Sequence, residues 1–357
     1  MRTQTSVILA ALGAVALGLG IVYGTGPTGQ TQQAADGRLV FPGLVPKLAS
    51  AERIEIVHKG VTLVLDRTGK QADAGWGVAG RGNYPAEPGK VHALLASLTE
   101  LRLDELRTSD PAQYVRLGVE DPAGKGADST LLRVLDGKGG TIASLIVGHA
   151  RSAMRGSADT LYVRQPTEKQ SWLADGRLAP GIDPLDWVDR SIVSIDAAKV
   201  ASDVVTRDNT TLTFRPVADK LALTDPADHP KLDDGKLEQV GSALTDLTMQ
   251  DVRRAPAPGT PLGRAVVTTT EGMIVTVDAS KDGANLWATL TASGKDAARL
   301  DQKLHGWAYQ IDGWRQQALV PTLADIKAAE PAAAAAPPAS TPAAPVPAPP
   351  TPVPLPK

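Results

Sequence analysis

One order of sequence patterns occurs twice along the chain, and it restricts the fold more than any other feature. Residues 52–66 alternate apolar and polar side chains on both sides of His58-Lys59-Gly60, which predicts a β-hairpin. A short strand around Trp76, a proline and an amphipathic helix over 88–101 follow. The same order starts again at residue 202, and its helix is expected to end at Thr245-Asp246-Leu247.

Each helix is followed by a series of short strands with turn residues between them. In the first half these segments are 131–136, 141–148 and 161–165, and in the second half they are 264–270, 273–279 and 285–290. Two tryptophans close each half, Trp172 and Trp187 in the first and Trp307 and Trp314 in the second. The patterns predict an α+β protein of two tandem related units, 51–197 and 198–327. Each unit would be an antiparallel β-sheet with one main amphipathic helix.

The N-terminus contains an apolar segment. Residues 7–23 carry no charged side chain, and Arg2 is the only charge before Asp36. A buried core helix would need a polar face, which this segment lacks, so we interpret residues 1–24 as a transmembrane helix. An uncleaved signal anchor is favoured over a cleaved signal peptide, because the small residues after the segment lead into Pro27. This topology predicts a single-pass inner-membrane protein with an extracytoplasmic, periplasmic body.

Two segments outside the units have compositions that cannot form a core. Residues 25–50 are interpreted as a tether, because the part up to Gly37 is small and polar. Residues 328–357 are predicted to be a disordered tail, since 11 of the 28 prolines lie in the last 27 residues. Such a tail favours polyproline II and is either a solvated extension, a spacer or a ligand for a proline-binding partner.

Composition and motifs argue against several kinds of chemistry. A formal net charge of -2 disfavours nucleic-acid binding, and the absence of cysteine removes thiol chemistry and cysteine-ligated metals. The five histidines are too far apart in sequence for a metal motif. Residues 75–80 match G-x-G-x-x-G, but no helix follows at once, so a glycine-rich strand and turn is the better interpretation. We therefore expect no catalytic residues, no cofactor, no metal and no enzymatic activity.

One local concentration of charge remains as a candidate site. Arg151, Arg155 and Arg164 surround a Ser- and Gly-rich connection between two expected strands. The connection is either an ordinary solvated loop or a surface that faces an anion, a lipid headgroup or a partner.

Several motifs in the chain resemble a bacterial family known as domain of unknown function 4340. They are Asn83-Tyr84-Pro85 with the helix that follows, the run from Leu117 to Pro122, Ile146-Val147-Gly148, and the run from Leu161 to Arg164. The likeness extends over about residues 50–325. It implies one N-terminal membrane helix, an extracytoplasmic body and encoding near ABC-type transport components, and it carries over no catalytic residues.

Together these features predict a non-enzymatic, membrane-anchored accessory or scaffolding protein linked to an ABC-type transport system. The expected partners are the transporter subunits, with the inner membrane contacted through residues 7–23. The alternative is a cell-envelope binding module that uses its Pro-rich tail as a spacer or ligand.

Overall fold

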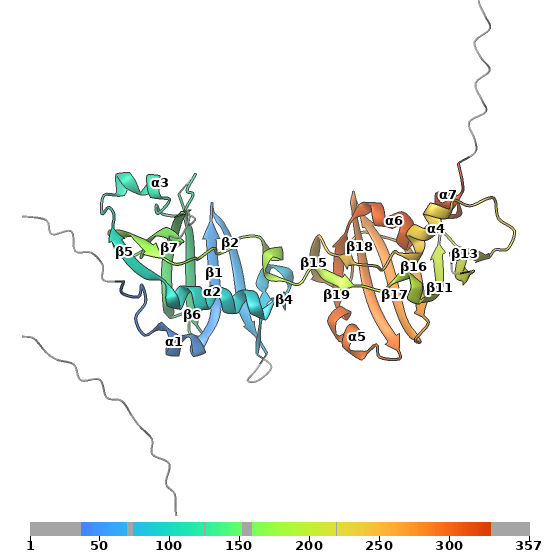
Figure 1. The fold of residues 1–357 in the computed structure, drawn as a ribbon, viewed down its shortest axis with the longest axis horizontal. Helices are drawn as coiled ribbons and strands as arrows, with labels where there is room; N and C mark the ends of the chain where they lie inside the picture. Colours follow the sequence, from blue (N-terminus) through green and yellow to red (C-terminus); the bar gives the residue numbers. More distant parts are fainter. Residues whose placement is uncertain (1–36, 70–73, 125, 152–158, 219, 330–357) are drawn as a thin grey trace, which may run out of the picture.

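The computed structural model describes residues 37–69, 74–124, 126–151, 159–218 and 220–329. Two large β-sheets lie side by side along the long axis of the molecule, each with its own helices (Figure 1). All strand pairs in the two sheets are antiparallel, within the described ranges. The predicted α+β class is confirmed.

The first sheet has nine strands in the order β4-β3-β2-β1-β6-β7-β8-β9-β5. Its strands are β1 (Ala51–His58), β2 (Val61–Thr68), β3 (Gly75–Val78), β4 (Tyr84–Pro85), β5 (Arg102–Leu106), β6 (Thr130–Asp136), β7 (Thr141–Arg151), β8 (Thr160–Arg164) and β9 (Ser171–Asp175). The predicted hairpin at His58 is confirmed as β1 and β2. The 75–80 segment is strand β3 followed by a 3-10 turn over Ala79–Arg81, as expected.

Helix α2 (Pro88–Glu100) crosses the core face of this sheet. Pro88 occupies the first turn, where its missing N–H has no intrahelical partner to lose. Val91, Leu94 and Leu98 are buried against the strands at helical spacing. On the opposite face, a 3-10 turn over Pro111–Gln113 and helix α3 (Tyr114–Leu117) bring Tyr114 and Val119 against Ile146.

The second sheet has eight strands in the order β13-β12-β11-β16-β17-β18-β19-β15. When β11 is matched with β1, β12 with β2 and so on to β19 with β9, the strands of the second sheet stand in the same order as those of the first. Strand β4 has no counterpart in the second sheet among the described strands. The strands are β11 (Val200–Arg207), β12 (Thr210–Val217), β13 (Lys220–Asp225), β15 (Asp251–Arg254), β16 (Thr260–Thr269), β17 (Met273–Asp282), β18 (Asn285–Gly294) and β19 (Trp307–Ile311). Helices α4 (Asp234–Gly241), α5 (Ala298–Leu304), α6 (Gln316–Leu319) and α7 (Leu323–Ile326) accompany them.

The helix of the second half is shorter than its apolar pattern predicts. Helix α4 starts where expected, because the Asp233 carboxylate accepts a hydrogen bond from the backbone N–H of Lys236. It ends at Gly241, and the hydroxyl of Ser242 donates to the carbonyl of Glu238. The chain then turns, and Leu247 begins strand β14 (Leu247–Thr248), which pairs with β10 (Ser191–Val193). The prediction of a helix through Leu247 was therefore wrong.

The predicted tether over 25–50 is also too long. The backbone N–H of Val40 donates to the carbonyl of Leu101 (2.9 Å), and the N–H of Leu103 donates to the carbonyl of Arg38 (2.8 Å). Helix α1 (Leu44–Lys47) and a 3-10 turn over Leu48–Ser50 follow, and Leu44 is buried in the main core. The backbone of 38–40 pairs with the outer edge of β5, so the folded body includes the described residues from about 37 onward.

Leu44 and Val45 provide a direct test of this boundary. Leu44 is 3% exposed and Val45 is 68% exposed on the same short helix. We expect Leu44→Ala to lower the free energy of unfolding by about 2–4 kcal/mol, because it leaves a cavity in the core. Val45→Ala should change it by less than about 0.5 kcal/mol. Urea unfolding of the two variants checks this, and equal small effects would restore the tether interpretation.

Within the described residues, no helix is long and apolar enough to cross a membrane. The segment 7–23 that we interpret as a transmembrane helix and the tail from 330 onward lie outside those residues.

The two halves meet at a mixed aromatic and polar junction. The ring of Tyr84 lies 4.8 Å from that of Trp307 and 6.2 Å from that of Tyr309, edge to face in both cases. The guanidinium of Arg254 lies 3.9 Å from the centroid of Trp307 and donates to the carbonyl of Gly82. One hydrophobic cluster includes buried residues of both halves, so the core is continuous across the junction.

Candidate functional site

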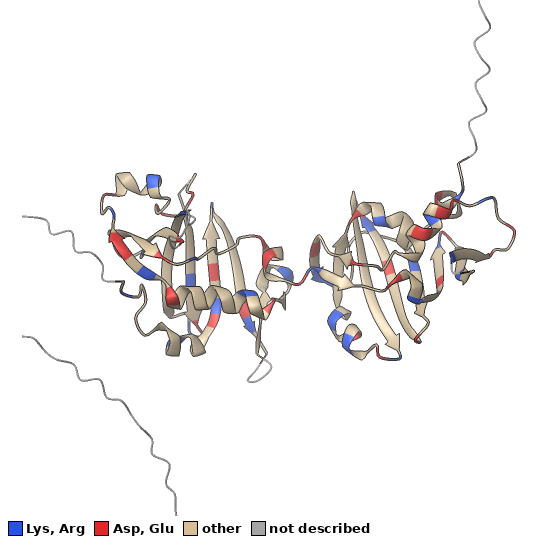
Figure 2. Ribbon diagram, in the orientation of Figure 1, with Lys and Arg blue, Asp and Glu red and all other residues tan. Residues whose placement is uncertain are grey.

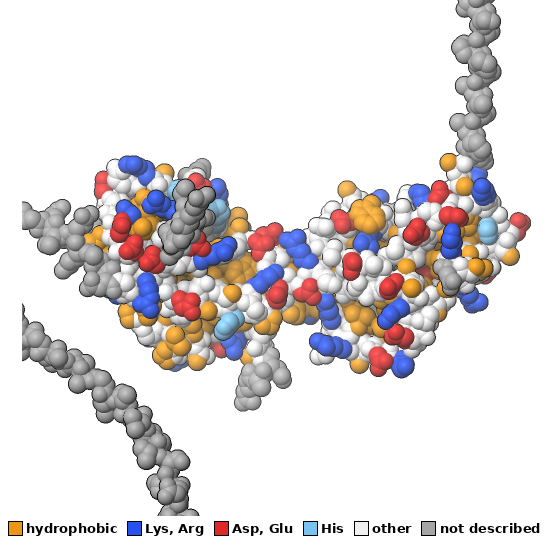
Figure 3. Space-filling view, in the orientation of Figure 1, with side chains coloured by type: hydrophobic (Ala, Val, Ile, Leu, Met, Phe, Trp, Pro, Cys, Tyr) orange, Lys and Arg blue, Asp and Glu red, His pale blue; other side chains and the backbone are white. Residues whose placement is uncertain are grey.

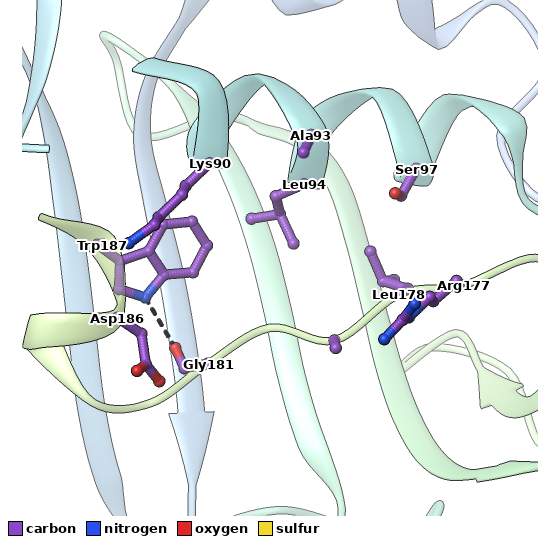
Figure 4. A pocket seen from close by; sticks show the side chains of 10 residues that line it. Lys90, Ala93, Leu94, Ser97, Arg177, Leu178, Gly181, Asp186 and Trp187 are labelled. Carbon is purple, nitrogen blue, oxygen red and sulfur yellow. Dashed lines mark hydrogen bonds between the residues drawn. The ribbon is translucent and has the colours of Figure 1, made fainter. Parts of the chain in front are cut away.

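A groove of about 410 Å³ runs between helix α2 and the chain that leaves strand β9 (Figure 4). One wall is the α2 face formed by Lys90, Ala93, Leu94 and Ser97, and the other is formed by Arg177, Leu178, Ala179, Gly181, Asp186 and Trp187. Its volume lies in the range of sites for small ligands and peptide side chains. We treat this groove as the candidate functional site.

The helical wall follows from the periodicity of α2. Lys90, Leu94 and Ser97 are spaced by four and three residues, so they lie along one face of the helix. Leu94 is buried toward the sheet and forms the floor. Ala93 and Ser97 are small, which leaves room above it.

The second wall has no regular secondary structure over residues 177–181, but hydrogen bonds hold its conformation at the Trp187 end. Asp183 caps a 3-10 turn over Pro184–Trp187 by accepting from the backbone N–H of Leu185. The indole Nε1–H of Trp187 donates to the carbonyl of Gly181 (3.0 Å), which closes the loop onto itself. A Cβ at Gly181 would lie 2.9 Å from the Asp186 carboxylate, so a larger residue there would displace this side chain.

The groove has charged groups at both ends. Near Trp187, the ammonium of Lys90 pairs with Glu87 (3.1 Å) and donates to the carbonyl of Val188 (3.4 Å). The Asp186 carboxylate lies at the same end. Arg177 lies at the other end, where its side chain forms no ion pair with any residue in the described part of the chain. The groove therefore has, among the described residues, an unpaired positive charge at one end and both positive and negative charges at the other.

The model of a known protein family, described as a domain of unknown function (DUF4340), matches residues 76–265. The match covers more than half of the chain, including the whole groove and the Tyr84 side of the junction. The chain belongs to the DUF4340 family. No curated protein and no solved structure matches it.

The arginine cluster predicted from the sequence is not assembled as expected in this DUF4340 protein. Arg151 is exposed at the end of β7, and Arg155 lies outside the described residues. Arg164 is only 8% exposed, and its guanidinium donates to the carbonyls of Val119 (2.9 Å) and Glu168 (3.1 Å). It also stacks 4.5 Å from the ring of Tyr114. Arg164 therefore has a structural role and does not face an anion or a partner from the surface.

The described residues include no group of three His, Cys, Asp or Glu side chains placed to hold a metal ion. Lysine, arginine and carboxylate side chains are intermingled over both halves, so the visible face has no broad patch of one sign (Figures 2 and 3). On this face, surface charge alone therefore does not single out a site.

One carboxyl group is buried inside a sheet, unlike the charged side chains on the surface. Asp203 on β11 is 2% exposed, its Oδ1 has no hydrogen-bond partner, and burial raises its pKa to about 8. It does not line the groove along α2, so we do not treat it as part of the candidate site.

The groove was missed in the sequence because its walls lie about 80 residues apart in the chain. The predicted amphipathic character of α2 is confirmed, but its apolar stripe marks the side that packs on the sheet and carries no signal for the opposite wall. The signal in the sequence is the run from Arg177 to Trp187, which has the periodicity of neither a strand nor a helix yet carries several apolar residues and a tryptophan.

Proposed function

We propose that this DUF4340 protein is a non-enzymatic accessory or scaffolding subunit of an ABC-type transport system. In this proposal residues 7–23 anchor it in the inner membrane, and the body lies on the extracytoplasmic side. Family membership supports the setting, and the apolar segment supports the anchor. The observation that carries the binding role is the groove along α2, which is apolar at its floor and charged at its ends.

We also propose that the two sheets are tandem related units. Their common strand order supports this, as does the register of corresponding strands. Ile54 pairs with Leu65 and Val134 in the first sheet, and Asp203 pairs with Phe214 and Val267 in the second. A two-unit body offers a long surface on which a partner can be held at a fixed distance from the membrane.

Site-specific photocrosslinking tests the binding role. A benzoylphenylalanine at Ala179, which is exposed at the rim of the groove, should crosslink the full chain to a membrane or ATP-binding subunit of a transporter in native membranes. The matched control is the same residue at Lys138, which lies on the exposed turn between β6 and β7. Mass spectrometry of the crosslinked bands identifies the partner.

The outcomes discriminate between the two functions we consider. Crosslinks to transporter subunits from Ala179 but not from Lys138 support the proposal. Crosslinks from neither position, combined with loss of envelope retention when residues 331–357 are deleted, would contradict it and favour the envelope-binding alternative.

A further inference from the structure

The main chain beside the groove is extended and unpaired. The backbone N–H and C=O groups of Arg177, Leu178 and Ala179 form no hydrogen bond with any described residue. Exposure alternates along the same three residues, with Leu178 buried and its two neighbours exposed, as on a strand. Unpaired extended backbone is a template on which another chain can add as a strand.

The groove next to this backbone suits small apolar side chains. Leu94, Leu178 and Trp187 are buried at its floor, while Ala93 and Ser97 keep the helical wall low. An added strand would present every second side chain to this floor, because side chains alternate between the two faces of a strand.

The charges decide which end of the groove would take an acidic side chain of such a strand. Arg177 has no ion pair in the described structure, whereas the end near Trp187 holds the Asp186 carboxylate and a lysine already paired with Glu87. An acidic side chain is therefore favoured at the Arg177 end and disfavoured at the Asp186 end.

We propose that the groove binds an extended peptide segment of a partner protein, which pairs with the backbone of 177–179 and places a carboxylate on Arg177. This inference rests on the proposed function, since it names the chemistry of the partner segment at the same groove. It adds that recognition is by main-chain pairing together with one charge.

Two capped peptides, Ala-Val-Ala-Val-Asp and Ala-Val-Ala-Val-Lys, test the inference on the full chain in detergent micelles. Hydrogen exchange followed by mass spectrometry should show slower exchange over residues 176–182 with the Asp peptide. In a protein labelled with ¹⁵N tryptophan, the indole N–H signal of Trp187, identified by its loss in Trp187→Phe, should shift on titration. We expect the Lys peptide to bind about tenfold more weakly, the ratio that one favourable charge contact produces.

Three variants separate the contributions. Arg177→Glu should weaken binding of the Asp peptide by about tenfold or more, while Lys138→Glu, with the same change in net charge, should leave it within about twofold. Ser97→Trp should abolish binding of both peptides by filling the groove. An Asp peptide methylated on its backbone nitrogens should also bind at least about tenfold more weakly, because its pairing donors are removed.

Equal binding of the two peptides to the native chain, unchanged binding of the methylated peptide, or no protection of residues 176–182 at millimolar peptide would each overturn the inference. Its failure is distinguishable from failure of the proposed function. Transporter crosslinks from Ala179 without peptide binding would support the transporter as the partner but reject an acidic extended peptide as the segment that binds. Peptide binding without transporter crosslinks would support the groove as a peptide-binding site and contradict the link to a transport system.

Discussion

Replacing Asp203 with isoleucine should stabilise the protein by about 4 kcal/mol at pH 7. The pKa of this carboxyl rises from 3.8 to about 8 in the folded state because burial disfavours the charged form. Each pKa unit corresponds to about 1.4 kcal/mol, so keeping the group buried at pH 7 costs roughly 4 kcal/mol. Urea unfolding of the full-length protein and of Asp203→Ile, followed by tryptophan fluorescence, measures the difference.

The choice of isoleucine comes from the first sheet. Ile54 lies at the position of β1 that corresponds to Asp203 on β11, and it is fully buried. The side chains that pair across from Asp203 are Phe214 and Val267, which are also buried and apolar. The nearest cation on its own strand, Arg207, is already bonded to the carbonyl of Val320 and lies near Asp208 and Asp325. No described charge compensates the Asp203 carboxylate.

The same shift predicts how stability depends on pH. Since the folded pKa lies above the unfolded value, the folded state holds more protons than the unfolded state between about pH 4 and 8. The contribution of Asp203 is therefore most favourable below pH 4, is lost as pH rises toward 8, and is constant above that. We expect Asp203→Ile and Asp203→Asn to flatten this slope, with the larger gain for isoleucine because it adds apolar burial.

Ile54→Asp is the matched reverse substitution. It should lower the free energy of unfolding by several kcal/mol at pH 7 and introduce a new slope between pH 4 and 8 in the first half. If Asp203→Ile leaves both stability and slope unchanged, the carboxylate must reach solvent or a partner in solution, and its burial in the sheet would be wrong.

Local patterns explain which elements were predictable from the sequence. The hairpins and helix α2 depend on neighbouring residues, so period-two and helical spacing were enough to place them. Helix α4 was overextended because Leu244 and Leu247 continue the helical spacing, although Gly241 and Ser242 end the helix. The position of β5 at the far edge beside β9 depends on residues about 70 positions apart, for which a single sequence carries no local signal.

Arg164 shows why candidate site residues are harder to predict than elements. Alternation along β8 places Leu161 and Val163 in the core and Arg164 on the other face, which sequence reasoning treated as solvent. That face is covered by the segment containing Tyr114 and Val119, so the arginine is buried and satisfied by carbonyl groups. The groove depends on a similar long-range approach, between α2 and residues 177–187.

Trp307→Ala, at the junction between the halves, should destabilise the protein by about as much as Asp203→Ile stabilises it. Trp307 is 7% exposed, its ring contacts Tyr84 of the first half edge to face, and the Arg254 guanidinium covers it. Removing the ring should cost about 3–5 kcal/mol, because it leaves a cavity and removes a cation–π contact. The matched control is Trp314→Ala, which removes a ring that is 64% exposed and contacts Arg315 at 4.7 Å, and should cost less than about 1 kcal/mol.

The substitution should also separate the unfolding of the two halves. Without the ring, the Arg81–Asp251 ion pair (2.5 Å) and the Arg254–Gly82 hydrogen bond remain, but both are partly exposed to solvent, and such contacts contribute about 0–1 kcal/mol each. The short pairing of β10 with β14 also remains between the halves. The coupling between the two sheets should therefore be weaker, and differential scanning calorimetry of Trp307→Ala should show a transition that is broader than that of the native chain or split in two. A single transition with the same small loss as Trp314→Ala would mean that the continuous core, and not the Tyr84–Trp307 contact, joins the halves.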